Sequence, residues 1–403
     1  MKRRAVLRGL VAAGGTSALA ACVDLQGNPD IPHGDPTNRP ARQHAWNDLL
    51  TTDEHGNPLL PEQHVFLSIS YDGDDREGDR SVLEDALTDL ETAYEASNEG
   101  LLFTVGYSPA YFERFDDPIE ADVPRPQRLV ASENIATDES DIFIHLASDH
   151  PSVVLEVREA LFGDHDANGV EITNLAGLFS LENRRSGFIG PGLPADRGNL
   201  LGIPENGVDS DAPTFMGFRA GFKQNQATEN RVTLQDGRFA GGTTQHVERL
   251  RHVLDEWVDR PLSGQVARLF SSELDPDDVG DMGEKLTDHN GVETINFDEL
   301  RRRAEEHGVV GHAEKLSQFR EDGRPPIIRR DVNSADNGEA ATLFIGLQRE
   351  FSDYKKLRLA MEGETLVEDG VVGERRENGI LQYIRTRERA NFLIPPRELR
   401  ALP

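Results

Sequence analysis

The stretch HVFLSISY (residues 64–71) marks the point where the chain begins to fold. Apolar and polar side chains alternate along it, which is typical of a strand with one buried face. The segment SVLEDALTDLETAYEAS (81–97) follows, and its spacing predicts a helix. One face of that helix collects the apolar side chains of Val82, Leu83, Ala86, Leu87, Leu90 and Tyr94.

Two further strands and a second helix continue this pattern. GLLFTVGYS (100–108) and IFIHLAS (142–148) predict strands, and HPSVVLEVREALF (150–162) predicts a helix. Strand, helix, strand, strand, helix is the order of a ferredoxin-like unit. We therefore expect residues 62–214 to form an N-terminal ferredoxin-like half.

The second part of the chain repeats the theme. GTTQHVERLRHVLDEW (242–257) begins as a strand, ATLFIGLQ (341–348) predicts a buried strand, and YKKLRLAMEG (354–363) predicts a helix. An Asp- and Gly-rich stretch at 275–290 indicates a surface insertion. We expect an α+β fold of the dimeric α/β-barrel type, with a second ferredoxin-like half at 215–403. The sheets of the two halves would pack face to face, with helices outside.

The first 22 residues have the layout of a targeting segment, with a charged start, a short apolar middle and a region of small residues. Arg3, Arg4 and Leu7 resemble a twin-arginine export signal, and LAAC resembles a lipobox in which Cys22 is lipidated. The alternative is an incidental cysteine in an exposed apolar N-terminus. We expect export by the twin-arginine pathway and a lipid anchor on the outer face of the cytoplasmic membrane. Because Cys22 is the only cysteine, the mature domain has no disulfide.

The amino-acid composition indicates the character of the surface and limits the classes of partner. Residues 23–61 are rich in Pro, Gly and Asn and predict a flexible polar linker. The formal charge of -29 comes from 72 acidic and 43 basic residues, of which only six are Lys. Such an even acidic excess indicates a surface suited to high salt, hence a halophilic host, and argues against nucleic-acid binding. An acidic face for a cationic partner is the alternative.

Several motifs, in their order along the chain, resemble those of the dye-decolourising (DyP-type) peroxidases, which bind heme on two ferredoxin-like halves. No zinc, iron–sulfur, Walker A or dinucleotide motif competes with this resemblance. The matching stretches are LLFTVGYSPAYFERF (101–115), FMGFRAGF (215–222), AGGT (240–243), GHAEKLSQFREDGRPPIIRRDV (311–332), LFIGLQREF (343–351) and NFLIPP (391–396). Of these, FMGFRAGF resembles the GxxDG motif of the family.

The resemblance implies a heme b site with named residues. His312 would be the iron ligand, with His307 as its competitor, because a neutral imidazole is a normal axial ligand. Arg330, eighteen residues later, would stabilise the departing oxyanion of hydrogen peroxide, the alternative being a surface salt bridge. Glu350 would accept a hydrogen bond from the imidazole, which holds the ring and raises its basicity. A solvated glutamate at a strand end is the alternative for Glu350.

The distal loop departs from the family pattern at one residue. Gly217, Phe218 and Gly221 would shape the loop around the heme, but Ala220 stands where the family has an aspartate. Alanine can neither accept nor donate the proton that this aspartate is thought to relay. An alignment that supplies another carboxylate stays open.

The resemblance and this departure together leave three candidate functions. The first is a peroxidase that oxidises an unknown reductant with hydrogen peroxide. The second is a heme-binding protein without turnover, and the third is a scaffold without heme. A homo-oligomer is compatible with each of them.

Overall fold

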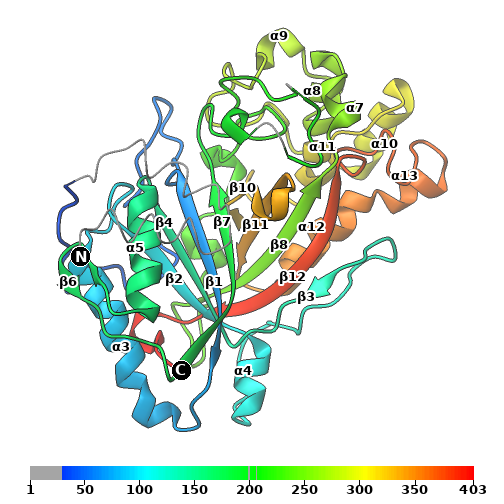
Figure 1. Ribbon diagram of the computed structural model, residues 1–403. Helices are drawn as coiled ribbons and strands as arrows, with labels where there is room; N and C mark the ends of the chain where they lie inside the picture. Colours follow the sequence, from blue (N-terminus) through cyan, green and yellow to red (C-terminus); the bar gives the residue numbers. More distant parts are fainter. Residues whose placement is uncertain (1–29, 198–199, 206) are drawn as a thin grey trace.

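The computed structural model describes residues 30–197, 200–205 and 207–403 (Figure 1). The predicted signal at 1–22, with its lipid-anchor candidate Cys22, lies outside the described residues, as does the first part of the predicted linker. In the described ranges, no helix is both long enough and apolar enough to cross a membrane.

The first half builds one antiparallel sheet with two helices on its outer face. Its strands lie in the order β7-β1-β4-β2, which is fourth, first, third, second along the chain. The predicted strands and helices of this half are confirmed, and alternate β1 side chains such as Val65 and Leu67 pack in one core with Leu87 and Val157 from the helices. Its elements are β1 (Gln63–Tyr71), α3 (Arg76–Ala93), β2 (Leu102–Tyr107), α4 (Pro109–Arg114), β3 (Ala136–Thr137), β4 (Ile142–Ser148), α5 (Pro151–Phe162), β5 (Asp166–Ala167), β6 (Val170–Glu171) and β7 (Phe179–Phe188).

The second half has the same strand order, β12-β8-β11-β10. Helices α7 to α13 gather around it, on the side of the molecule away from α3 and α5 (Figure 1). Its elements are α6 (Glu229–Val232), β8 (Thr243–His252), α7 (Asp255–Val258), α8 (Leu262–Leu269), α9 (Pro276–Val279), α10 (Phe297–His307), α11 (His312–Ser317), β9 (Ile328–Arg329), β10 (Val332–Ser334), β11 (Ala341–Gln348), α12 (Phe351–Glu362), α13 (Glu364–Glu368) and β12 (Ile384–Ile394).

The two halves join edge to edge into one closed ring of eight strands. Tyr107 of β2 pairs with Leu393 of β12, and Phe188 of β7 pairs with Asn333 of β10. This closed barrel agrees with the expected dimeric α/β-barrel type. The expected packing of two separate sheets face to face is corrected, because edge pairing satisfies backbone groups that open sheets leave exposed. The rings of Phe143 and Phe392, one from each half, stack inside it with centroids 4.8 Å apart.

The segment predicted as a flexible linker is packed from residue 30 onward. It has little regular secondary structure, but the Trp46 side chain is 2% exposed. The Gln43 amide bonds the backbone of Val105 in β2, in both directions, and the carbonyl of Pro395. Proline and glycine therefore set an irregular path here, while tertiary contacts hold it against the barrel.

The expected surface insertion at 275–290 is also packed in part. Val279 is fully buried and Leu286 is 7% exposed, both in a core that includes Phe218 and Trp257. The acidic residues of this stretch face solvent, but its apolar residues cover one end of the second half. This cover lies over the loop that the sequence analysis singled out.

Candidate active site

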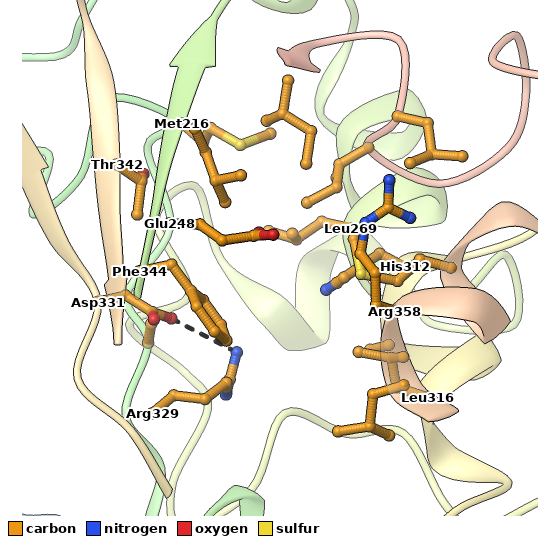
Figure 2. A pocket seen from close by; sticks show the side chains of 18 of the residues that line it. Met216, Glu248, Leu269, His312, Leu316, Arg329, Asp331, Thr342, Phe344 and Arg358 are labelled. Atoms are coloured by element: carbon orange, nitrogen blue, oxygen red, sulfur yellow. Dashed lines mark ion pairs between the residues drawn. The ribbon is translucent and has the colours of Figure 1, made fainter. Parts of the chain in front are cut away.

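A cavity of about 340 Å³ lies against the outer face of the second half's sheet. Figure 2 shows its two walls. Phe344 of β11, with Arg329 and Asp331 from the neighbouring edge, stands on the sheet side, and His312 of α11 lies on the helix side. The lining includes many large apolar side chains: Met216, Phe218, Leu250, Leu269, Phe270, Leu316, Phe344, Leu357, Met361, Ile380 and Leu381.

His312 is presented to the cavity by the first turn of α11. Gly311 precedes it, and any side chain there would collide with the carbonyl of Phe270, at 2.0 Å from the added carbon. The Glu314 carboxylate accepts a hydrogen bond from the Gly311 amide at 2.9 Å and one from Ser271 Oγ at 2.6 Å. This local network fixes where α11 begins and hence where the imidazole points.

The electrostatic surroundings keep His312 neutral. Burial, followed by the positive charges of Lys315, Arg329 and Arg358, lowers the pKa of His312 to about 3. A neutral imidazole is the form that ligates a metal. The competitor His307 lies elsewhere, on the exposed face of α10, where its Nε2 atom is 2.9 Å from Glu273.

The structure places Arg329, and not its neighbour Arg330, at the position expected of the cavity arginine. Successive side chains of an extended strand point to opposite faces. Arg329 lines the cavity, whereas Arg330 points into the barrel, where it donates to the carbonyl of His44 at 2.6 Å and lies 3.8 Å from the centre of the Trp46 ring. Arg330 is therefore corrected as the cavity arginine. The alternation in IIRRDV was the signal that could have separated Arg329 from Arg330.

Asp331 is a cavity residue that the sequence analysis missed. It lies two residues after Arg329 on the same face, and its Oδ2 atom is 3.6 Å from Arg329 Nη1 (Figure 2). Its Oδ1 atom is buried without a hydrogen-bond partner. Burial raises the pKa of Asp331, and the charge of Arg329 opposes that effect.

The predicted distal loop does border the cavity. Phe218 and Gly221 line it, but Gly217 does not. Both glycines adopt positive φ, 92° and 86°, a conformation that side chains disfavour, so the loop depends on them. The Phe218 ring packs edge-on against Phe270 at 5.3 Å.

A second cavity of about 770 Å³ adjoins the first at this loop. Ala220 lines both cavities. A small molecule in the second cavity would meet the loop and the sheet edge before reaching His312. The residues shared by the two linings are Thr214, Arg219, Ala220, Gly221, Arg329 and Asp331.

The structure does not bring Glu350 to the imidazole. Glu350 is exposed at the start of α12, and its carboxylate accepts a hydrogen bond from Ser352 Oγ at 3.2 Å. The expected role is corrected because the chain turns outward between β11 and α12. The charged groups that act on the pKa of His312 are cationic instead, and Lys315 has the largest effect among them.

Two other carboxylates of the cavity wall are held in a buried network. Arg389 Nε donates to Glu248 at 2.8 Å, and Arg389 Nη2 donates to Glu133 at 2.8 Å. Arg358 lies 2.9 Å from Glu133. Burial opposes ionisation of Glu248, but His246 and Arg389 outweigh it and lower the pKa of Glu248 to about 2.

This network predicts an acid-dependent loss of stability. The pKa of Glu248 falls from 4.5 to about 2 on folding, so ionised Glu248 stabilises the fold above pH 4.5, and this contribution is lost as the pH falls toward 2. We expect it to be about 3 kcal/mol. Urea unfolding of the wild type and Glu248→Gln should differ most at neutral pH and converge near pH 2. The exposed Glu293→Gln serves as the control, and a pH-independent difference between wild type and Glu248→Gln would contradict the prediction.

The residues present fit a heme group. A porphyrin needs an apolar slot, one axial ligand and cations for its two carboxylates. The cavity supplies apolar walls and the neutral His312, with Arg375, Arg385 and Arg387 also in its lining. In the described part of the chain, no cluster of three or more His, Cys, Asp or Glu could hold a metal by itself.

Solved structures share this fold. A dye-decolorizing protein from V. cholerae superposes with a TM-score of 0.54 and 15% identity over 88% of this chain and 98% of that chain. A dye-decolorizing peroxidase from Bacteroides thetaiotaomicron gives 0.52 and 16%, with 88% and 98% covered. An aspartate-to-alanine variant of DypB from Rhodococcus jostii RHA1, in complex with heme, gives 0.55 and 15%, with 85% and 96% covered. The chain therefore has the fold of the DyP-type peroxidases.

Sequence comparison places the chain in a family. The model of a family of unknown function, DUF7405, matches residues 61–396, so the chain belongs to that family. No curated protein matches the sequence.

Proposed function

We propose that this protein is a heme-dependent peroxidase of the DyP type, which oxidises an unknown reductant with hydrogen peroxide. The observation that carries the proposal is the placement of the neutral His312 across an apolar cavity from Arg329. The shared fold is consistent with it, and the DypB variant is one such structure in complex with heme.

The residues on the helix side and on the sheet side of the cavity would have different roles. Bound heme b would supply the electrons that cleave the O–O bond of hydrogen peroxide. His312 would hold the iron from the helix side. The Arg329 guanidinium, which makes no side-chain hydrogen bond in the described structure, would stabilise the negative charge that develops on the departing oxygen. Arg375, Arg385 and Arg387 would pair with the heme carboxylates.

A second candidate is a heme-binding protein that does not turn over peroxide. Ala220 favours it, because the loop has alanine at the position where the DyP-type peroxidases have an aspartate. The two candidates share the heme site and differ only in proton transfer. A scaffold without heme is the third reading, and a heme spectrum would exclude it.

The place of action is part of the same proposal. The N-terminal motif with Cys22 suggests export by the twin-arginine pathway, a route known for folded cargo, and a lipid anchor to the membrane. The acidic surface suggests a halophilic setting. Loss of membrane fractionation in Cys22→Ser would support the anchor, and unchanged fractionation would contradict it.

Heme loading is the first test of the proposed function. Protein expressed with a heme supply and kept in high salt should show a Soret band, and rapid mixing with hydrogen peroxide should change that band within the first turnover. A Soret band without a peroxide response would favour the second candidate. The absence of any Soret band would contradict both.

A further inference from the structure

We propose that Asp331 is the proton-transfer residue of this cavity, in place of the acid that the distal loop lacks at Ala220. The inference rests on the proposed function and names a residue for it. Asp331 comes from the sheet edge, so the acid would act from a different element than the loop.

The position of Asp331 suits this role. It lies between β9 and β10, two residues after Arg329, and both side chains point into the cavity from the wall opposite His312 (Figure 2). Asp331 also lines the second cavity, together with Ala220. A peroxide molecule that crosses from the second cavity would therefore meet Asp331 and Arg329 together.

Asp331 is also the acidic residue of the described lining whose carboxylate makes an ion pair but no hydrogen bond. The first cavity has three acidic side chains, Glu133, Glu248 and Asp331. Glu133 and Glu248 are both bound by Arg389. Asp331 has one oxygen without a partner and the other 3.6 Å from Arg329, beyond hydrogen-bond length.

An unused carboxylate oxygen in a buried wall indicates a ligand. Leaving a buried acceptor unpaired costs about 1–3 kcal/mol, so such groups are rare unless another molecule pairs with them. The side chain of Asp331 is 24% accessible, and that area faces the cavities that it lines. Because Oδ1 itself is covered, a protonated oxygen of peroxide would supply the missing donor once the carboxyl group turns toward the cavity.

In the proposed step, Asp331 accepts one proton and releases it again, so that the carboxylate is regenerated. The carboxylate would take the proton from one oxygen of hydrogen peroxide, the inner oxygen, and return it to the other, the outer oxygen. The outer oxygen keeps the electron pair of the broken O–O bond and, with two protons, leaves as water. Bound heme would supply two electrons. The reductant would later restore them together with two protons, so that the second oxygen also leaves as water, and Asp331 ends as the carboxylate that began the step.

The burial of Asp331 is compatible with this exchange. Burial raises its pKa, which brings the carboxyl closer to the pH at which it can both accept and release a proton. The charge of Arg329 acts in the other direction and preserves the carboxylate form.

The test compares Asp331→Asn with the wild type, both loaded with heme. We expect an unchanged Soret band and a peroxide reaction slowed by about 10²-fold or more. Cyanide provides a readout besides turnover, because hydrogen cyanide must give up its proton to bind ferric heme. Its binding rate should fall in the same variant. Glu350→Gln, an exposed acid at the end of the same sheet, should leave both rates unchanged.

A second pair of variants guards against a folding defect. Asp331→Ala should slow both reactions, and Ala220→Asp in that background should recover at least part of the rate, because it restores an acid beside the same space. Wild-type rates in both Asp331 variants would overturn the inference but leave the proposed function intact. A wild type with no Soret band or no peroxide response would overturn the proposed function, and the inference with it.

Discussion

Replacing His312 by alanine is expected to abolish heme binding. His312 is the imidazole that the cavity presents from its helix wall (Figure 2). The other histidine of the described lining, His252 of β8, lies on the sheet side, where its Nε2 atom is 2.9 Å from Thr342 Oγ1. Changes to outer-shell partners alone lower metal affinity by 10–100-fold, so loss of the ligand itself should lower the apparent affinity for heme by more than about 100-fold. Titration with heme, followed at the Soret band, measures this loss.

Two controls separate ligation from folding. His307→Ala removes the competing histidine, which lies exposed beside Glu273, and should leave the Soret band unchanged. Imidazole added to His312→Ala should restore part of the band, because a free ligand can fill the space of the side chain. A full band in His312→Ala, or its loss in His307→Ala, would show that the iron ligand has been assigned to the wrong histidine.

Replacing Arg329 by alanine is expected to slow the peroxide reaction by about 10²–10³-fold. The guanidinium is the fixed cation on the sheet wall, and an anion that develops in a buried site gains more from such a charge than it would in water. Stopped-flow mixing of the heme-loaded variant with hydrogen peroxide measures the rate. The Soret band before mixing should be that of the wild type, since Arg329 is not the iron ligand.

Arg330→Ala is the matched control, because the two arginines are adjacent and differ only in the face that they occupy. We expect no change in the peroxide rate. The fold should lose about 2 kcal/mol of unfolding free energy, since the guanidinium stacks on Trp46 and donates to the His44 carbonyl inside the barrel. The reverse outcome, a slow Arg330→Ala and a normal Arg329→Ala, would restore the assignment that sequence spacing alone suggested.

The placement of Arg329 rather than Arg330 in the cavity shows the precision with which a sequence motif can locate a functional residue. The resemblance located the arginine pair to within one residue, but a one-residue step along a strand reverses which side of the sheet a side chain faces. The pairing of Arg329 with Gly346 and of Ile328 with Leu347 sets that choice. Neither partner lies near Arg329 in the sequence.

Local periodicity determined β1, α3, β2, β4 and α5 of the first half and β8, β11 and α12 of the second, because alternation and helical spacing depend on neighbours in the chain. The order of motifs also brought His312, Phe218 and Gly221 to one region before any geometry was known. The tertiary structure decided the rest: the closed barrel, the packing of residues 30–61, the exposure of Glu350, and the unpartnered carboxylate oxygen of Asp331. Each of these depends on contacts between residues far apart in the chain, and no local pattern of residues encodes such contacts.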